Sequence, residues 1–419
     1  MDYQVNTEQP LIMHIDMNSA FASVEQQANR LLRGVPVGVA ANLSPGGCVI
    51  SPSKEVKAMG VKTGFRVRDA VEIAPDIRII APDPDKYFYI HKRFSELFKE
   101  YSPDVVPLSI DEAVINFKGT PALRAQGMEQ IGREIKDRML GEIGEWLTCN
   151  VGIGTNRFLA KLAASIHKPD GLDVITHENL REVYSNVTLL DLCGINTRNK
   201  ARLNLNGIYT PLEFLDAPMW KLWKQVFNSV QGRHWYFRLR GWEVDDITYK
   251  RKTYGQTYAI HHFTNDTEEL SKLMMKLCEK MGRRLRKSGN YALGIHVNCG
   301  YRGYPWWHMG RKGAKKLYAT QDLHATAMQL LENRSRWQKV THIGVTCYDL
   351  RSVKHVADTL FETDESRAFR LADALDAVND RYGEYSVHTA RMQGLDDQII
   401  QRVPFHATTD TLSEIYLES

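Results

Sequence analysis

The sequence predicts an α+β protein of several domains, and three observations support this fold class. A chain of 419 residues is too long for a single hydrophobic core, which suggests two to four domains. Short apolar runs typical of strands alternate with amphipathic stretches typical of helices, without a strict strand–helix–strand repeat. The composition, with 43% hydrophobic and 25% charged residues, is that of an ordinary globular protein.

Composition also excludes several classes of protein. No apolar run approaches the roughly 20 residues that cross a bilayer, and the first ten residues, MDYQVNTEQP, read as a polar leader without the features of a signal peptide. We therefore expect a cytoplasmic protein with no membrane partner. The six cysteines lie far apart and form no CxxC pair, so reduced thiols are expected and a zinc site is not.

The first acidic motif lies near the N-terminus. Leu11, Ile12 and Ile15 predict a buried strand that leads into Asp16. The stretch SAFASVEQQANRLL keeps apolar residues at helical spacing, so a helix should start directly beyond this acid. Residues 26–81 then form a small insertion, in which PVGVAA and GGCVIS are strands on either side of a turn.

A second acidic motif follows a predicted amphipathic helix, KYFYIHKRFSELFKEYS, and precedes another around residues 128–139. Here the run VVPLSI predicts a buried strand that leads into Asp111 and Glu112. Adjacent strand residues point to opposite faces, so both acids can serve one site only where the strand is twisted or bulged. For either motif alone, ordinary solvated acids at a strand end would be the better interpretation.

Together the two motifs would bring three carboxylates to the ends of neighbouring strands. Like charges at close range raise one another's pKa unless a cation neutralises them. Oxygen ligands of this kind suit Mg²⁺ or Mn²⁺, and a pair of such ions is the usual apparatus of phosphoryl or nucleotidyl transfer. Hydrolysis of a phosphodiester by the same metals is a competing chemistry that the carboxylates alone do not exclude.

The second half of the chain is predicted to contain a helical segment and then a basic domain. Residues 177–246 are mostly helical, with turns at Gly194 and Gly207 where backbone amides can approach a phosphate, although a plain helical hairpin explains them equally well. The last domain should contain strands in YALGIHVNCGY and VTHIGVTCYDL and three amphipathic helices. Residues 250–354 hold 20 Lys and Arg against 7 Asp and Glu, whereas the remaining residues hold 34 against 43. This excess, interleaved with aromatic residues, predicts nucleic-acid binding.

These motifs resemble the Y-family of translesion DNA polymerases. The likeness is carried by HIDMNSAFASVE, SIDEA, VGIGTNRFLAKLAASIHKPDGLDVI and CGINTRNKARLNLNGI, in this order, and it extends over residues 11–405. It implies a right-hand polymerase whose parts follow the polar leader at 1–10: a palm at 11–25 and 82–176, fingers at 26–81, a helix-hairpin-helix-like thumb at 177–246, a DNA-binding little finger at 247–405 and a tail at 406–419.

Within the family, the sequence looks closer to UmuC, the catalytic subunit of polymerase V, than to DinB, or polymerase IV. Asn18 and the segment SKEVKAMGVKTG carry this leaning. DinB-like proteins usually have a second Asp where Asn18 stands, and a Tyr and an Arg near Lys54 and Lys57. The two lysines would keep the positive charge of that region without the bidentate fork of an arginine.

The resemblance also implies the roles of individual residues. Asp16, Asp111 and Glu112 are expected to be catalytic and, with the backbone carbonyl of Met17, to hold two Mg²⁺ ions, for which Mn²⁺ could substitute. Phe21 matches the steric gate that excludes ribonucleotides, and a helix-core role is its simple alternative. Other nucleotide contacts are expected at Asn18, Ser19, Ala20, Lys54, Lys57 and Lys168, and DNA contacts at Lys161, Gly194, Arg251, Lys252, Arg302, Arg311 and Lys312.

We therefore expect a template-directed DNA polymerase that transfers a nucleotide from a dNTP to a primer 3′-hydroxyl during translesion synthesis, DNA repair and the SOS response. The expected partners of this monomeric, nucleoid-associated chain are primer-template DNA and dNTP, with a sliding clamp, a UmuD-type subunit and a recombinase filament as further candidates. Residues 401–405, QRVPF, faintly resemble a clamp-binding peptide, although a last strand explains them better.

Two alternatives to a polymerase stay open. One is a catalytically silent DNA-damage adaptor on the same fold, which the intact carboxylates disfavour. The other is a metal-dependent nuclease or cyclase with a similar palm, which the basic C-terminal domain disfavours.

Overall fold

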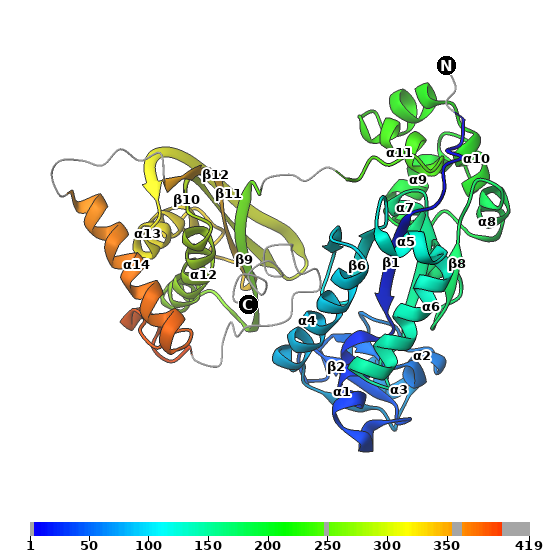
Figure 1. Cartoon of the computed structure of the whole chain (residues 1–419). Coiled ribbons are helices and arrows are strands. Elements are labelled where there is room, and N and C mark those ends of the chain that lie inside the picture. Colours follow the sequence, from blue (N-terminus) through cyan, green and yellow to red (C-terminus); the bar gives the residue numbers. More distant parts are fainter. Residues whose placement is uncertain (1–3, 247–250, 354–362, 396–419) are drawn as a thin grey trace. The chain divides into compact units, whose positions relative to one another are not determined.

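The computed structural model describes residues 4–246, 251–353 and 363–395, apart from the side chains of Ala125 and His261, and the chain divides into two compact units (Figure 1). The first unit ends at Ile247 and the second begins at Thr248. The predicted division of the first unit into palm, fingers and thumb stays a prediction. The tail at 406–419 and the peptide at 401–405 lie outside the described residues. No helix among the described residues combines the length and apolar character of a membrane span.

The first unit is built around a five-stranded sheet in the order β5-β6-β1-β7-β8. The central strand β1 (Ile12–Met17) runs antiparallel to β6 (Glu112–Asn116) and to β7 (Cys149–Gly154). The edge strand β5 (Val105–Pro107) is antiparallel to β6, whereas β8 (Leu172–Val174) is parallel to β7. The α+β fold class and the mainly antiparallel sheet are therefore confirmed.

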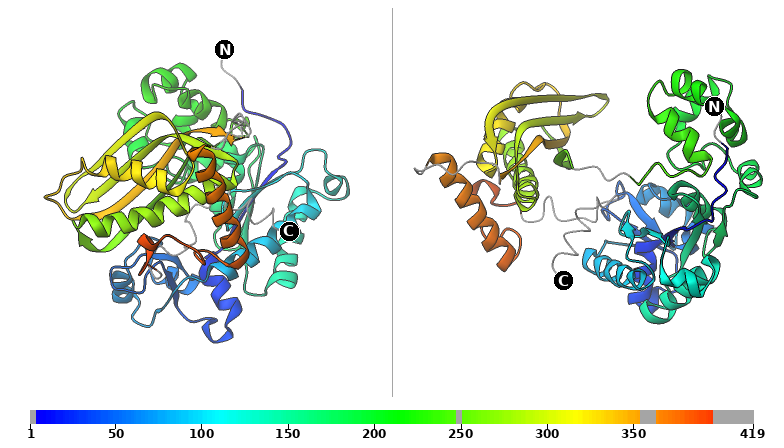
Figure 2. Two further views of the ribbon diagram at one scale, coloured as in Figure 1. Left: turned by 90° about the vertical axis from the view of Figure 1, so that its left-hand side faces the viewer. Right: turned by 45° about the horizontal axis from the view of Figure 1, so that its top comes forward.

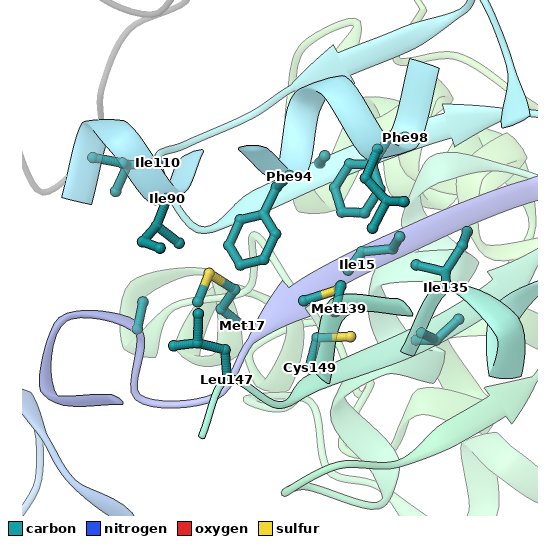
Figure 3. Packing of buried hydrophobic residues seen from close by; sticks show 14 of the residues in the cluster. Ile15, Met17, Ile90, Phe94, Phe98, Ile110, Ile135, Met139, Leu147 and Cys149 are labelled. Carbon is teal, nitrogen blue, oxygen red and sulfur yellow. The ribbon is translucent and has the colours of Figure 1, made fainter. Parts of the chain in front are cut away.

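Alternation along β1 gives the sheet a core face and a second face that carries the first acid. Ile15 packs with helices α4 (Pro84–Tyr101) and α6 (Met128–Arg138), which confirm the two helices predicted in this region (Figure 3). Successive strand side chains point to opposite faces, so Asp16 lies on the other face. Helix α7 (Arg157–Ile166) packs against β1 and β7 there.

Helix α1 (Ala20–Ala28) begins later than the sequence suggested. It does not start directly beyond Asp16, because Ser19 adopts a left-handed backbone with φ of 52° and turns the chain between strand and helix. It also ends earlier, and the apolar residues that follow form a separate 3₁₀ turn (Arg30–Leu32).

The second acidic motif is a hairpin, and the prediction of one strand leading into both acids is wrong. Strand β5 ends at Pro107, whose nitrogen carries no hydrogen, and the chain then turns so that Leu108 N donates to Glu112 O at 2.9 Å. Asp111 lies in this turn, whereas Glu112 is the first residue of β6. Both acids can therefore approach one site without the twist or bulge that a single strand would require.

Two smaller parts of the first unit lie between the strands of the central sheet in the sequence, one between β1 and β5 and the other between β6 and β7. Residues 37–80 form a three-stranded sheet in the order β3-β2-β4 over a core of their own, which confirms the two strands predicted there. The elements are β2 (Val37–Ala40), β3 (Val49–Pro52), α2 (Lys54–Ala58), α3 (Val67–Ile73) and β4 (Arg78–Ile80). Between β6 and β7, α6 is preceded by α5 (Pro121–Ala125) and followed by a π-helical turn (Met139–Ile143).

Residues 180–239 are helical, as predicted, and pack around buried aromatic residues such as Tyr184 and Trp235. Gly194 and Gly207 lie in the turns before and after α9 with φ of +97° and +70°, a region that favours glycine. The elements are α8 (Leu180–Asn186), α9 (Thr197–Asn204), α10 (Pro211–Asp216), a π-helical turn (Lys221–Val226) and α11 (Gln231–Leu239).

The second unit is an antiparallel sheet in the order β11-β10-β12-β9, with α12 and α13 side by side on one face (Figures 1 and 2). The predicted strands around residues 291–301 and 340–350 and the three predicted helices are confirmed. The elements are β9 (Thr253–Thr264), α12 (Thr267–Lys287), β10 (Asn290–Tyr301), β11 (Tyr304–Leu317), α13 (Thr320–Leu331), β12 (Val340–Ser352), α14 (Asp364–Tyr382) and a 3₁₀ turn (Ala390–Met392).

Strand β11 has no counterpart among the predicted elements. It lies at the edge of the sheet, and nearly all of its side chains up to Lys315 are exposed. Basic residues and glycines fill the positions where an alternating apolar pattern would otherwise reveal a strand. An edge strand of this composition presents charge beside a free backbone edge, which protects a sheet from pairing with other strands.

Candidate active site

Three carboxylates meet where β1 and the hairpin of β5 and β6 lie side by side. Asp16 on β1 is directly opposite Glu112 on β6 in the register of the sheet. Asp111 is held beside them because its backbone carbonyl accepts a hydrogen bond from Met17 N at 3.0 Å. The structure therefore brings together the three acids that the sequence analysis selected.

Each carboxylate also has a partner on a neighbouring element. Lys161 on α7 donates to Glu112 Oε2 at 2.6 Å, and Lys168 in the loop after α7 forms an ion pair with Asp16. Ser109 in the hairpin turn donates through its hydroxyl to Asp111 Oδ1 at 2.5 Å. Two of the three negative charges are therefore balanced by lysines from the same face of the sheet.

Burial and mutual repulsion raise the pKa values of two of these acids, whereas neighbouring positive charge lowers that of the third. Burial raises the pKa of Asp16, with Lys168 opposing the rise and Glu112 adding to it. Burial likewise raises the pKa of Asp111, where the bond from Ser109 opposes the rise and the other two carboxylates add to it. For Glu112, burial acts in the same direction, but the ammonium group of Lys161 outweighs it and the pKa is lowered.

The donor set fits a hard divalent cation. Within the described part of the chain, the bonds above engage one oxygen of each carboxylate, and carboxylate and carbonyl oxygens are the ligands that Mg²⁺ prefers. As they lie among the described residues, no three Asp, Glu, His or Cys side chains have the arrangement that would hold a metal ion. Binding of a cation would therefore require Asp16 and Glu112 to exchange their lysine partners for it.

Two further side chains lie close to the acids. His14 is fully buried at 3.8 Å from Glu112, and burial lowers its pKa to about 3, so it is neutral at pH 7. Burial also lowers the pKa of Lys57 on α2, together with the charge of Lys168, whereas Asp16 and Asp111 oppose this shift. Lys57 thus lies within electrostatic range of the acids, as expected for a residue that meets a nucleotide beside them.

The other predicted nucleotide contacts have diverse surroundings. Lys54 does not join the acids, because its ammonium group lies over the ring of Trp146 at 4.3 Å from the centroid. Asn18 uses its side chain in hydrogen bonds to Thr148 and Asn150. Ser19 forms the left-handed turn before α1, and Ala20, the first residue of that helix, is buried.

The predicted gate residue, Phe21, is 9% exposed and stacks on Tyr87 with ring centroids 4.4 Å apart. Tyr87 is fixed in turn because its hydroxyl donates to Glu25 Oε1 at 2.9 Å, while Lys86 binds the other oxygen of Glu25 at 2.9 Å. The helix-core alternative therefore describes the burial of this ring, and its role as a gate stays a prediction. No local pattern in the sequence points to Tyr87, because it meets Phe21 only through tertiary packing.

The predicted DNA contacts are divided between the two units and lie on several different elements. In the first unit, Lys161 pairs with Glu112 and belongs to the acidic site, whereas Gly194 is exposed in the turn before α9. In the second unit, Arg311 is opposite Ile295 and Lys312 opposite Gly294, so the two basic side chains point to opposite faces of the sheet. The remaining three are Arg251 and Lys252, directly before β9, and Arg302, in the turn between β10 and β11.

Comparisons with known proteins agree with this architecture. The impB/mucB/samB family model matches residues 15–165, and the model of that family's C-terminal domain matches residues 251–360. The chain is 31% identical to DNA polymerase IV of Pelotomaculum thermopropionicum over 90% of its own length and 94% of the relative's, and 31% identical to DNA polymerase IV of Moorella thermoacetica over 90% and 95%.

Solved structures show the same fold. A Y-family DNA polymerase chimera of Dbh and Dpo4 has a TM-score of 0.70 at 22% identity, over 81% of this chain and 98% of its own. An insertion ternary complex of Dbh DNA polymerase has a TM-score of 0.55 at 22% identity, over 80% and 98%.

The two-unit α+β fold, with three acids and two lysines gathered on its central sheet, defines a multidomain DNA-directed DNA polymerase. The chain belongs to the impB/mucB/samB family, the Y-family of translesion DNA polymerases. The silent adaptor and the nuclease are not favoured by these relatives. The leaning toward UmuC is not confirmed, because the relatives compared here are named DNA polymerase IV.

Proposed function

We propose that Asp16, Asp111 and Glu112 carry out two-metal nucleotidyl transfer from a dNTP to the 3′ end of a primer paired with a DNA template. The observation that supports this is the acidic cluster itself: three carboxylates from two neighbouring strands and one turn, two of them with pKa values raised by burial and by one another. A buried acidic cluster of this kind has little structural benefit without a cation.

Different residues of the chain would bind the metal ions and the triphosphate. Asp16, Asp111, Glu112 and the backbone carbonyl of Met17 would hold two Mg²⁺ ions. When bound, such ions would activate the primer hydroxyl and stabilise the leaving pyrophosphate. Lys168, 44% exposed, would turn from Asp16 to the triphosphate, with Lys57 nearby.

The basic second unit would hold the duplex backbone. Its exposed strand β11 and the residues before β9 supply charge for phosphates, which carry most of the affinity of a non-sequence-specific DNA-binding protein. A sliding clamp, a UmuD-type subunit and a recombinase filament stay predictions from the family resemblance.

Primer extension by the purified full-length chain tests the proposal. Extension of a labelled primer should require added Mg²⁺ or Mn²⁺, stop when EDTA is in excess, and continue past a template lesion such as an abasic site. Shortening of the primer with Mg²⁺ and dNTP present would contradict the proposal and indicate a nuclease. DNA binding without any extension would indicate an adaptor.

A further inference from the structure

We propose that Asn150 is a positioning residue for Lys168; the inference rests on the proposed function, which assigns the triphosphate to that lysine. Asn150 is 1% exposed and lies on β7 directly opposite Asp16 on β1. Lys168 lies in the loop between α7 and β8, and its ammonium group pairs with the same Asp16. Asn150 is thus the neighbour of the acid that Lys168 reaches.

A chain of hydrogen bonds connects β1 with the lysine loop through Asn150. Gly171 N donates to Asn150 Oδ1 at 3.1 Å, and Asn150 Nδ2 donates to Asn18 Oδ1 at 2.6 Å. Asn18 Nδ2 then donates to Thr148 Oγ1 at 3.0 Å. A backbone N–H can only donate, so Gly171 determines the orientation of both side-chain amides.

The loop that carries Lys168 is closely constrained at its far end. Asp170 has a left-handed backbone with φ of 61°, and a side chain at Gly171 would lie 2.2 Å from His167 O, so the chain folds back tightly on itself. Lys136 binds Asp170 Oδ1 at 3.1 Å. Two bonds attach this folded segment to β7: Gly171 N donates to Asn150 Oδ1 at 3.1 Å, and Val151 N donates to Gly171 O at 3.0 Å. The first of them is the side-chain bond that depends on Asn150.

These contacts close a ring through the active site. The backbone runs from Asp16 on β1 to Asn18 in the turn directly after that strand. Side-chain amides lead from Asn18 through Asn150 to Gly171, and the loop returns to Lys168, whose ammonium group meets Asp16. The position of the lysine relative to the acid therefore depends on Asn150. The same ring explains why residue 18 carries an amide side chain. Asn18 Oδ1 accepts a hydrogen bond from Asn150, and Asn18 Nδ2 donates one to Thr148.

Single-nucleotide insertion kinetics by the full-length protein test this role. Asn150→Leu keeps the number and branching of the side-chain heavy atoms but leaves Gly171 N and Asn18 Oδ1 without their partners. The loss of one buried hydrogen bond corresponds to roughly a tenfold effect. We expect the KM for dNTP to rise about tenfold with kcat changed less than about threefold, because the defect is in holding the nucleotide. Asn150→Asp keeps the acceptor for Gly171 N but adds a buried carboxylate opposite Asp16, so this variant should keep the attachment of the loop without restoring the KM for dNTP in full.

Two comparisons separate positioning from general damage. In a Lys168→Met background, Asn150→Leu should have no further effect on KM, since residues that act through one another are not additive. Asn379→Leu in the second unit is a matched control, because Asn379 is also buried and holds a loop through two bonds to Val387, each 2.9 Å long. It should lower the melting temperature without changing the KM for dNTP.

The outcomes distinguish this inference from the proposed function. An unchanged KM in folded Asn150→Leu, or an equal increase in both backgrounds, would overturn the role of Asn150. An unchanged KM in Lys168→Met would instead overturn the assignment of Lys168 to the triphosphate. Hydrogen exchange of residues 167–173, measured without nucleotide, then tests only whether Asn150 attaches the loop that carries Lys168 to β7. Faster exchange in Asn150→Leu supports this attachment, and unchanged exchange refutes it.

Discussion

Replacement of Phe21 tests whether its ring selects the sugar or only fills the core. The ring is 9% exposed and stacked on Tyr87, so Phe21→Ala should remove about 3 kcal/mol from the free energy of unfolding, at the lower end of the usual range for a buried phenylalanine. Phe21→Leu keeps most of the volume and should cost about 1 kcal/mol, or roughly 2–4 °C in melting temperature. The leucine variant is therefore the informative one, because it stays folded while it loses the flat ring.

Single-nucleotide insertion with matched ribo- and deoxyribonucleotides measures the selection. If the ring excludes a 2′-hydroxyl by volume, Phe21→Leu should reduce the preference for deoxyribonucleotides by roughly 10- to 200-fold, the range for small steric differences in a pocket. Phe98→Leu is the control, since Phe98 is a buried aromatic residue of the same core that stacks on Phe94. It should lose similar stability and keep the sugar preference. An unchanged preference in folded Phe21→Leu would refute the gate.

Three other predictions concern the acids and the basic unit. Asp111→Ala should reduce primer extension at least 1,000-fold, roughly the loss expected for an essential ligand, and Glu112→Ala should be nearly as damaging. Primer-template affinity, measured by fluorescence anisotropy, should stay within about twofold. Near-normal extension by Asp111→Ala would contradict the metal assignment. A protein ending at Asp246 should bind DNA at least tenfold more weakly than the full chain, and the log affinity of the full chain should fall linearly with log salt concentration. Equal affinities of the two proteins, or an affinity that does not depend on salt, would show that the basic residues of the second unit are ordinary solvated surface charges. Asp111→Asn should raise the melting temperature in EDTA at pH 7 by a few degrees, because burial raises the carboxyl pKa in the folded state and makes its ionised form costly. The gain should shrink as pH falls through the raised folded-state pKa and disappear well below the unfolded-state pKa of about 3.9, where the acid is protonated in both states. A gain that grows on acidification would refute the sign.

The sequence predicted those parts of the fold and site that depend on local patterns. Strand β1 and helix α4 have clear periodicities, and the three acids follow apolar runs that end at the same edge of the sheet. Strand β11 escaped prediction because an exposed edge strand has no buried face to impose alternation. Both arms of the hairpin that turns after Pro107, β5 and β6, are apolar, so the local pattern predicts a single strand there.

Partners across the fold could not be read from the sequence for a different reason. Tyr87 meets Phe21, and Asn150 meets Asn18, only after segments far apart in the chain have packed. Nothing in the local pattern distinguishes a buried asparagine in a strand from an exposed one, so its hydrogen bonds are a tertiary property. Lys54 and Lys57 show the same limit, since two lysines on one short helix have different neighbours, an aromatic ring and the acidic cluster.

The lysines around the acidic cluster reduce the repulsion between its carboxylates. Three carboxylates crowded on one sheet face would repel one another, but Lys161 and Lys168 each neutralise one of them and Lys57 adds a third positive charge nearby. Lys161 is two-thirds covered and bound to the carboxylate whose pKa it lowers, whereas Lys168 is 44% exposed on a loop. The two lysines therefore differ in exposure, which agrees with the proposal that Lys161 stays bound to Glu112 while Lys168 exchanges Asp16 for a triphosphate. In that proposal, Asn150 limits the positions that the ammonium group of Lys168 can reach.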